Sequence, residues 1–160
     1  MLSAPKSTDT TIGEFKAQDI FGNEITENIF MDYDLTLVNI FTTWCSPCVA
    51  EIPHLAEIDS EMEGKGVNVV GIVMDVNDKG SINEEKLAKA NAIAKKTGAE
   101  FEFIIPDDAL RKSRLKGISA YPETFFVDSK GNIIGDAYVG ARSKEEWIKI
   151  IEKELKSIKE

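Results

Sequence analysis

The chain has 160 residues, of which 42% are hydrophobic and 29% are charged, and its formal net charge at pH 7 is −9. This length suits one domain with its own hydrophobic core, and the balanced composition excludes a disordered, collagen-like or membrane-spanning chain. The excess of acidic side chains opposes binding to nucleic-acid phosphates and to anionic lipid surfaces. We therefore expect one globular domain without a nucleic-acid partner.

Residues 1–12 are polar and rich in Ser and Thr, and they lack the apolar core of a signal peptide. Such a composition predicts a flexible linker or tether ahead of the patterned part of the chain, which begins at Gly13. No later segment marks a second boundary, so residues 13–160 are expected to form a single domain.

The first half of the domain predicts a strand pair, a buried strand and a long helix. Apolar residues between positions 13 and 30 flank the turn signal Gly22-Asn23, which favours two short strands. Residues 35–41 are nearly all apolar or β-branched, as is typical of a central strand that is covered on both faces. A helix should follow as far as about residue 63, because the glycines after it end the helix.

The second half continues the alternation of strand and helix and closes with a hairpin and a last helix. The predicted elements are, in order, strand 67–74, polar loop 75–83, helix 84–96, strand 101–105, short helix 107–116, hairpin strands 124–128 and 132–138, and helix 143–160. Ser143 and Glu146 form a capping-box pattern at the start of the last helix, and Trp147 begins its apolar stripe. This order predicts an α/β domain.

The two cysteines lie at the predicted junction of strand and helix, in Trp44-Cys45-Ser46-Pro47-Cys48. The loop between them is too short to stabilise a fold, so we infer a role in redox chemistry. At the first turn of a helix, unpaired backbone N–H groups and the helix dipole favour a thiolate. Cys45 is therefore the predicted nucleophile, and Cys48 is the predicted resolving thiol.

Two neighbours fit a redox site of this kind. Pro47 suits the first helical turn, where its missing N–H would be unpaired in any case, and Trp44 would shield one side of the thiols. Half of a zinc site is the competing interpretation, because Cys-x-x-Cys is also a metal-binding spacing. His54 is the only further Cys or His in the chain, so we expect no metal site and regard His54 as a surface residue.

Residues 44–53, Trp-Cys-Ser-Pro-Cys-Val-Ala-Glu-Ile-Pro, resemble the W-C-x-P-C-x-x-E-x-P signature of TlpA/ResA-type thioredoxin-like proteins. The likeness extends from residues 19–23 through residues 121–128 to the Gly131-Asn132 hairpin. It implies a thioredoxin fold for the α/β domain, in which helices flank a central mixed sheet. An N-terminal strand extension and an insertion before the middle helix would complete this fold.

The same resemblance implies which residues contact the substrate. In that family a cis proline precedes the first hairpin strand and faces the cysteine pair, which maps onto Pro122 with Tyr121 before it. Together with Trp44 and Pro47, these residues would bind the substrate chain. Where relatives often have Thr after the proline, this chain has Glu123.

Glu51 is the third catalytic residue that the resemblance implies. It lies one helical turn beyond Cys48, where an acid would relay protons or tune the thiols during exchange. A solvated carboxylate on the helix surface is the alternative, because sequence spacing does not determine burial.

In family terms the function would be dithiol-disulfide exchange with protein substrates, in the reducing direction and of the type used in cytochrome c maturation. The resemblance implies a monomer without a cofactor that works outside the cytoplasm and receives electrons from a membrane thiol donor. The full-length protein would be anchored in the membrane.

Two other functions stay open at this point. A thiol peroxidase is suggested by Thr42, three residues before Cys45, because this spacing resembles part of the peroxiredoxin pattern P-x-x-x-T-x-x-C. Position 38 is Val, however, where that pattern has Pro. A metal-delivery module is the other class, and the lack of further soft ligands argues against it.

Overall fold

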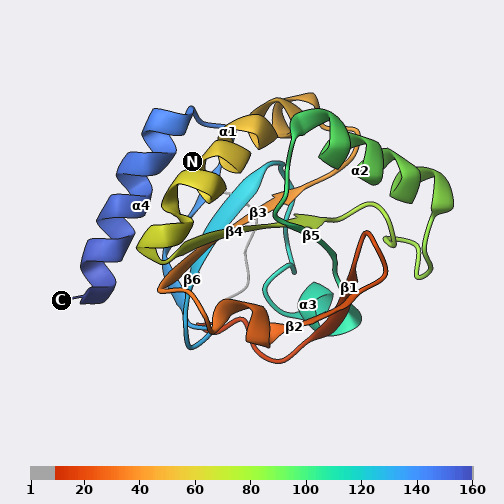
Figure 1. Ribbon diagram of the computed structural model, residues 1–160. Coiled ribbons are helices and arrows are strands. Elements are labelled where there is room, and N and C mark those ends of the chain that lie inside the picture. The colour runs from red at the N-terminus through yellow and green to blue at the C-terminus, as the bar shows by residue number, and fades with distance from the viewer. Residues whose placement is uncertain (1–9, 160) are drawn as a thin grey trace.

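The structure is a computed structural model, and it describes residues 10–159 (Figure 1). Most of the predicted linker lies outside these residues. Within them, Thr11 forms an isolated bridge with Asn132, and buried Ile12 donates its N–H to the Gly131 carbonyl at 2.8 Å. The folded domain therefore includes the last two residues of the segment that is predicted as a linker.

A seven-stranded mixed sheet forms the centre of the domain, in the order β2-β1-β5-β4-β3-β6-β7. Its strands are β1 (Lys16–Asp19), β2 (Glu24–Thr26), β3 (Leu35–Phe41), β4 (Val67–Val73), β5 (Glu102–Ile105), β6 (Glu123–Asp128) and β7 (Ile133–Val139). Strand β3 pairs parallel with β4 and antiparallel with β6, and every residue of β3 is buried. The prediction of a central strand that is covered on both faces is confirmed.

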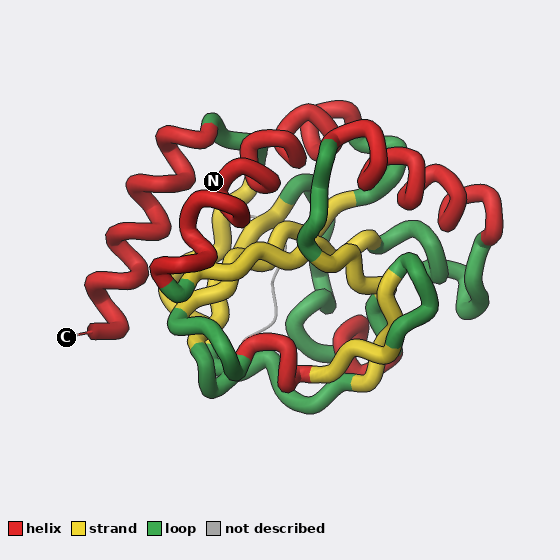
Figure 2. Tube along the Cα trace, in the orientation of Figure 1, coloured by secondary structure: helices red, strands yellow, loops and turns green. Residues whose placement is uncertain are grey.

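Helices cover both faces of the sheet, as the resemblance implied. Three long helices lie over one face, the upper one in Figures 1 and 2: α1 (Ser46–Met62), α2 (Glu84–Thr97) and α4 (Lys144–Lys159). The other face packs against the short helix α3 (Asp108–Lys112) and the 3-10 turn η1 (Glu27–Phe30). A second 3-10 turn, η2 (Glu63–Lys65), follows α1 directly. Strands β1 and β2 form the predicted N-terminal extension at one edge of the sheet.

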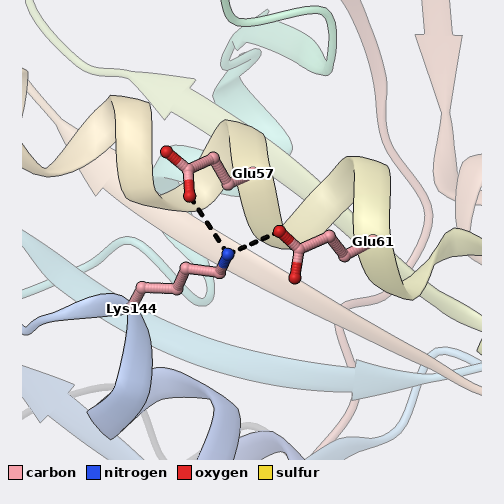
Figure 3. A network of polar contacts seen from close by, with 3 residues as sticks. All are labelled: Glu57, Glu61 and Lys144. Carbon is pink, nitrogen blue, oxygen red and sulfur yellow. Dashed lines mark hydrogen bonds and ion pairs between the residues drawn. The ribbon is translucent and has the colours of Figure 1, made fainter.

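Helix α4 begins with the predicted capping box. The Glu146 N–H donates to Ser143 Oγ at 3.1 Å, and the Ser143 N–H donates to Glu146 Oε1 at 3.0 Å. Next to this cap, the Lys144 ammonium group bridges Glu57 and Glu61 on α1 (Figure 3). These contacts hold the start of α4 against α1.

The segment after β5 differs from its predicted form. The sequence predicts a helix over residues 107–116, but α3 ends at Lys112, and the backbone of Ser113 leaves the helical region with φ −113° and ψ −106°. The Ser113 hydroxyl donates to the Ala109 carbonyl at 2.7 Å. This side chain therefore occupies a carbonyl of the last helical turn that would otherwise accept a backbone N–H. Turns then lead to Gly117, whose φ of 82° favours glycine.

Two acidic side chains meet where β1 lies beside β5. Buried Asp19 accepts the backbone N–H groups of Phe21 and Asn23 at 2.8 and 2.9 Å. Burial raises the pKa of Glu102 to about 7, and the hydrogen bond with Asp19 and the charge of Asp19 add to this rise. The pair therefore binds or releases one proton near neutral pH.

Replacement of Glu102 with Gln is expected to change how stability depends on pH. The pKa of Glu102 in the folded state lies above its ordinary value of 4.5, so its stabilising contribution is complete below that value and is lost as the pH rises through about 7. Glutamine keeps a donor towards Asp19 at every pH. Between about pH 5 and 8 the variant should gain about 1 kcal/mol relative to the wild type, a value that allows for solvent screening. Urea unfolding across this range measures the difference, and parallel profiles would contradict it.

Candidate active site

The two cysteines stand at the start of α1, directly after the loop that leaves β3. Cys45 is the N-cap residue and Cys48 lies in the first turn, with their Cα atoms 5.3 Å apart and a disulfide bond between their sulfurs. Cys48 is completely buried, whereas Cys45 is 4% exposed. The prediction that Cys48 is the less exposed of the two is confirmed.

The N-terminus of α1 interacts with the Cys45 sulfur. The Cys48 N–H donates to Cys45 Sγ at 3.3 Å, so a backbone donor in the first turn finds its acceptor in the sulfur. Pro47 lies in the same turn and has no N–H that needs a partner. In the reduced protein, the same donor and the helix dipole favour a thiolate at Cys45.

A buried carboxylate holds the loop before Cys45. Asp75 accepts the Thr43 N–H at 3.0 Å and the Thr43 hydroxyl at 2.6 Å, and both residues are buried. Phe41 pairs with Val73 in the parallel ladder of β3 and β4, so Thr43 and Asp75 each stand two residues beyond the end of a strand. The strand register therefore brings these two residues together, and no local sequence motif predicts their contact.

The loop before β6 approaches the site from another part of the chain. The Tyr121–Pro122 peptide bond is cis, which confirms the expectation for Pro122, and the Tyr121 carbonyl oxygen lies 3.8 Å from Cys45 Sγ. The Trp44 ring meets the Tyr121 ring edge-on, with 6.0 Å between the ring centroids. Trp44 is 62% exposed, and Pro47 is also exposed on the first turn of α1. Of the predicted substrate-binding residues, Trp44 and Pro47 are thus close neighbours of Cys45 in the chain, and the Tyr121–Pro122 peptide approaches its sulfur.

Glu51 is buried in the interior of the domain. It is 1% exposed, so the alternative of a solvated surface carboxylate is wrong. Three groups donate to its carboxylate: the Trp147 indole at 2.7 Å, the Arg142 backbone N–H at 2.9 Å and the Asn39 amide at 3.2 Å. Burial raises the pKa of Glu51, although these hydrogen bonds act in the opposite direction. A buried acid with a raised pKa is suited to proton transfer.

Replacement of Glu51 with Gln is expected to slow disulfide exchange without unfolding the protein. The amide keeps the size of the side chain but cannot take up a proton, so the rate at pH 7 should fall about a hundredfold. Glutamine removes the buried charge but turns an NH2 group toward at least one of the three donors, so the free energy of unfolding at pH 7 should fall by about 1 to 3 kcal/mol.

Rate–pH profiles test the role of Glu51. The matched control is Glu57→Gln, an exposed position further along the same helix, which should keep the wild-type profile. A Glu51→Gln profile that is superimposable on the wild type would show that the residue has a structural role alone.

Metal-binding clusters and membrane-spanning helices are both absent from residues 10–159. Within this range, no three His, Cys, Asp or Glu side chains lie close enough together to hold a metal ion. Of the helices described there, none combines the length and the apolar character needed to cross a membrane.

Several bacterial redox proteins are similar to this chain in sequence. The thiol:disulfide interchange protein DsbE of Pseudomonas fluorescens biotype C is 36% identical over 115 residues, which cover 69% of this chain and 54% of that protein. DsbE of Haemophilus influenzae is 28% identical over 81% of this chain and 64% of its own length. The thiol-disulfide oxidoreductase ResA of Geobacillus thermodenitrificans is 26% identical over 94% and 77% of the two chains. The chain thus spans less than two thirds of the length of these DsbE proteins.

The fold is shared with solved structures, and a family match covers most of the chain. A thiol:disulfide interchange protein of the thioredoxin family from Chlorobium tepidum superposes with a TM-score of 0.75 at 24% identity, over 96% of this chain and 99% of that one. StoA from Bacillus subtilis gives 0.65 at 20% identity, over 88% and 98% of the two chains. Residues 9–135 match the AhpC/TSA family. The chain therefore belongs to the AhpC/TSA family and is one of its TlpA/ResA-type thioredoxin-like members.

Proposed function

We propose that the chain is a thiol-disulfide oxidoreductase that exchanges its Cys45–Cys48 pair with disulfide bonds of protein substrates. In the reduced protein, the Cys45 thiolate attacks one sulfur of a substrate disulfide, a mixed disulfide forms, and the other substrate sulfur leaves as a thiolate. Cys48 then attacks Cys45 Sγ, which forms the Cys45–Cys48 disulfide and releases the second substrate thiol. Two electrons pass from the cysteine pair to the substrate.

One observation carries this proposal. The disulfide pair lies at the N-cap of α1, where the Cys48 N–H donates to the Cys45 sulfur. A donor at this position stabilises negative charge on Cys45, so a larger fraction of Cys45 is thiolate and able to attack the substrate disulfide. The slightly greater exposure of residue Cys45, 4% against 0% for Cys48, supports the same order of events.

The substrate chain is proposed to lie across the exposed side of the disulfide. Trp44 and Tyr121 supply aromatic surface there, and Pro47 is exposed on the first turn of α1. The Tyr121 carbonyl, which precedes cis Pro122, lies 3.8 Å from the Cys45 sulfur. A cis proline leaves the backbone before it open to an extended segment, so the Tyr121 main chain would align the substrate. Glu51 would accept or supply a proton as the thiols change state.

The direction of exchange and the setting of the protein are proposed from the family. Relatives named DsbE and ResA are called thiol:disulfide interchange proteins and thiol-disulfide oxidoreductases, which supports the exchange reaction. We propose that this chain runs it in the reducing direction. We propose that it works outside the cytoplasm, in the manner of cytochrome c maturation, and that a membrane thiol donor reduces it. A monomer that is anchored in the membrane in its full-length form would suit this role.

Insulin reduction by the wild-type protein and the redox potential of its Cys45–Cys48 pair test this function. With dithiothreitol as the source of electrons, it should reduce insulin disulfides faster than dithiothreitol alone. Equilibration with dithiol buffers should give a potential near the reducing couples, close to about −270 mV. A potential near about −120 mV would instead indicate an oxidase. Absence of insulin reduction, together with rapid consumption of peroxide, would favour the thiol peroxidase that Thr42 suggests.

A further inference from the structure

A cavity that Trp44 helps to line lies between α1 and α2. It has a volume of about 410 Å³ and opens beside Cys45, and the start of α1 contributes Val49 and Ala50 to its wall. Helices α1 and α2 lie side by side over the same face of the sheet (Figures 1 and 2). The cavity therefore adjoins the sulfur that is proposed to attack the substrate.

One face of α2 forms the opposite wall. Lys89, Ala92, Ile93 and Lys96 line the cavity, and their spacing of i, i+3, i+4 and i+7 places them on one side of a helix. Ile93 is 8% exposed and forms an apolar floor, while Ala92 is exposed. The two lysines are exposed at either end of this face. The result is an apolar pocket with a basic rim.

The charge of this pocket is opposite to that of the chain as a whole. The protein has 28 acidic residues against 19 basic ones, yet no carboxylate lines the cavity beside Cys45. A cavity between η1, the end of α1 and the start of β4 shows the contrast, because it is lined by acidic side chains that include Glu24, Asp59 and Glu102. Within residues 10–159, neither Lys89 nor Lys96 makes an ion pair. Both ammonium groups are thus available to a ligand.

We infer that this cavity is a substrate subsite that takes an apolar side chain next to the substrate cysteine, and that Lys89 and Lys96 select substrates with acidic residues beside it. The inference rests on the proposed exchange function, because the occupant must reach Cys45. An apolar side chain of the substrate would shield the surfaces of Ala92 and Val49 in the cavity from water. Carboxylates that flank it complement the two lysines and speed association on an otherwise acidic surface.

The test uses two synthetic peptides, each with one internal disulfide and Leu next to the first cysteine. The residues on either side of the Leu–Cys pair are both Asp in one peptide and both Asn in the other. The wild type should reduce the Asp peptide with about fivefold higher kcat/KM than the Asn peptide, through two solvent-exposed charge contacts. The double variant Lys89→Glu/Lys96→Glu should reverse this order. High salt should weaken the preference of the wild type, because screening shortens the range of the lysine charges.

A matched control separates the subsite from overall charge. Lys86→Glu/Lys95→Glu changes the net charge by the same amount on the same helix, but neither residue lines the cavity, so the preference should persist. A neutral small disulfide, hydroxyethyl disulfide, reports the intrinsic reactivity of Cys45 in each variant, because charges beside a thiol change its thiolate fraction. The peptide preference is a ratio within one variant, so such a change does not affect it.

The apolar part of the subsite has its own variant. Ala92→Phe fills the cavity from an exposed helical position, so the fold should be retained. KM for the Asp peptide should rise about tenfold, as expected for the loss of one buried Leu-sized contact, while the rate with hydroxyethyl disulfide should be unchanged.

The outcomes distinguish the two proposals. If hydroxyethyl disulfide and both peptides stay unreduced, the exchange function fails and the subsite fails with it. If hydroxyethyl disulfide and both peptides are reduced at normal rates but without preference, the subsite alone is overturned. An equal loss of preference in Lys86→Glu/Lys95→Glu would also overturn it, because net charge would then explain the selectivity.

Discussion

Cys45→Ser is expected to abolish disulfide exchange, with a fall of at least about a thousandfold in the rate of insulin reduction, as follows from loss of a nucleophile. The Cys45 sulfur accepts a hydrogen bond from the Cys48 N–H and lies 3.8 Å from the Tyr121 carbonyl oxygen. Serine keeps the shape of the side chain and can cap the helix through its hydroxyl. The loss should therefore come from chemistry and not from unfolding, and circular dichroism and thermal unfolding check this.

Cys48→Ser is the matched partner of that variant. Its Cys45 thiolate can still attack, but no second thiol of the protein releases the substrate, so one fast step should be followed by arrest. Rapid mixing with a disulfide peptide separates the first step from turnover. Full turnover by Cys45→Ser, or equal first steps in the two variants, would contradict the assigned order.

Arg114→Met is expected to lower the free energy of unfolding by about 3 kcal/mol and Tm by about 10 °C. Arg114 Nη2 lies 3.0 Å from Glu123 Oε2, with side-chain exposures of 6% and 0% for the two residues. The guanidinium also lies over the Phe125 ring, 4.1 Å from its centroid. Methionine fills much of the volume but removes a charged partner from a fully buried carboxylate, which is costly.

Two controls accompany this measurement by urea unfolding. Lys16→Met removes an ion pair with Glu24 whose side chains are 79% and 57% exposed, so the free energy of unfolding should change by less than about 1 kcal/mol. Arg114→Met/Glu123→Gln should recover part of the loss, because the buried charge is removed with its partner. A fall for Arg114→Met that is no larger than for Lys16→Met would show that this pair does not stabilise the fold.

Much of the fold follows from local sequence patterns. The apolar run of β3 predicts a fully covered strand, and the Ser143–Glu146 spacing predicts the cap of α4, because both depend on neighbours in the chain. The Cys45–Cys48 spacing at a strand-to-helix junction likewise predicts the redox pair. The boundary of α3 is harder to predict, since the Ser113 side chain competes for a helical acceptor.

The contacts that support the site depend on the register of distant segments. Thr43 meets Asp75 only because β3 and β4 end at the same edge of the sheet. Trp147 is predicted as an apolar residue of its helix, yet its indole N–H donates to Glu51 from 96 residues further along the chain. Asn39 donates to the same carboxylate from the middle of β3. A polar amide in an apolar strand indicates that a buried polar partner exists, but the sequence does not say which residue it is.

Trapping the mixed disulfide shows whether Cys45 attacks the substrate and Cys48 resolves the intermediate. Reduced Cys48→Ser should be mixed with a disulfide peptide, quenched with acid and analysed by mass spectrometry after digestion. A covalent adduct of one protein chain and one peptide, joined through Cys45, should form. No adduct should form with Cys45→Ser, whose Cys48 thiol is fully buried. An adduct through Cys48 in Cys45→Ser, or no adduct in Cys48→Ser, would show that Cys45 is not the attacking thiol.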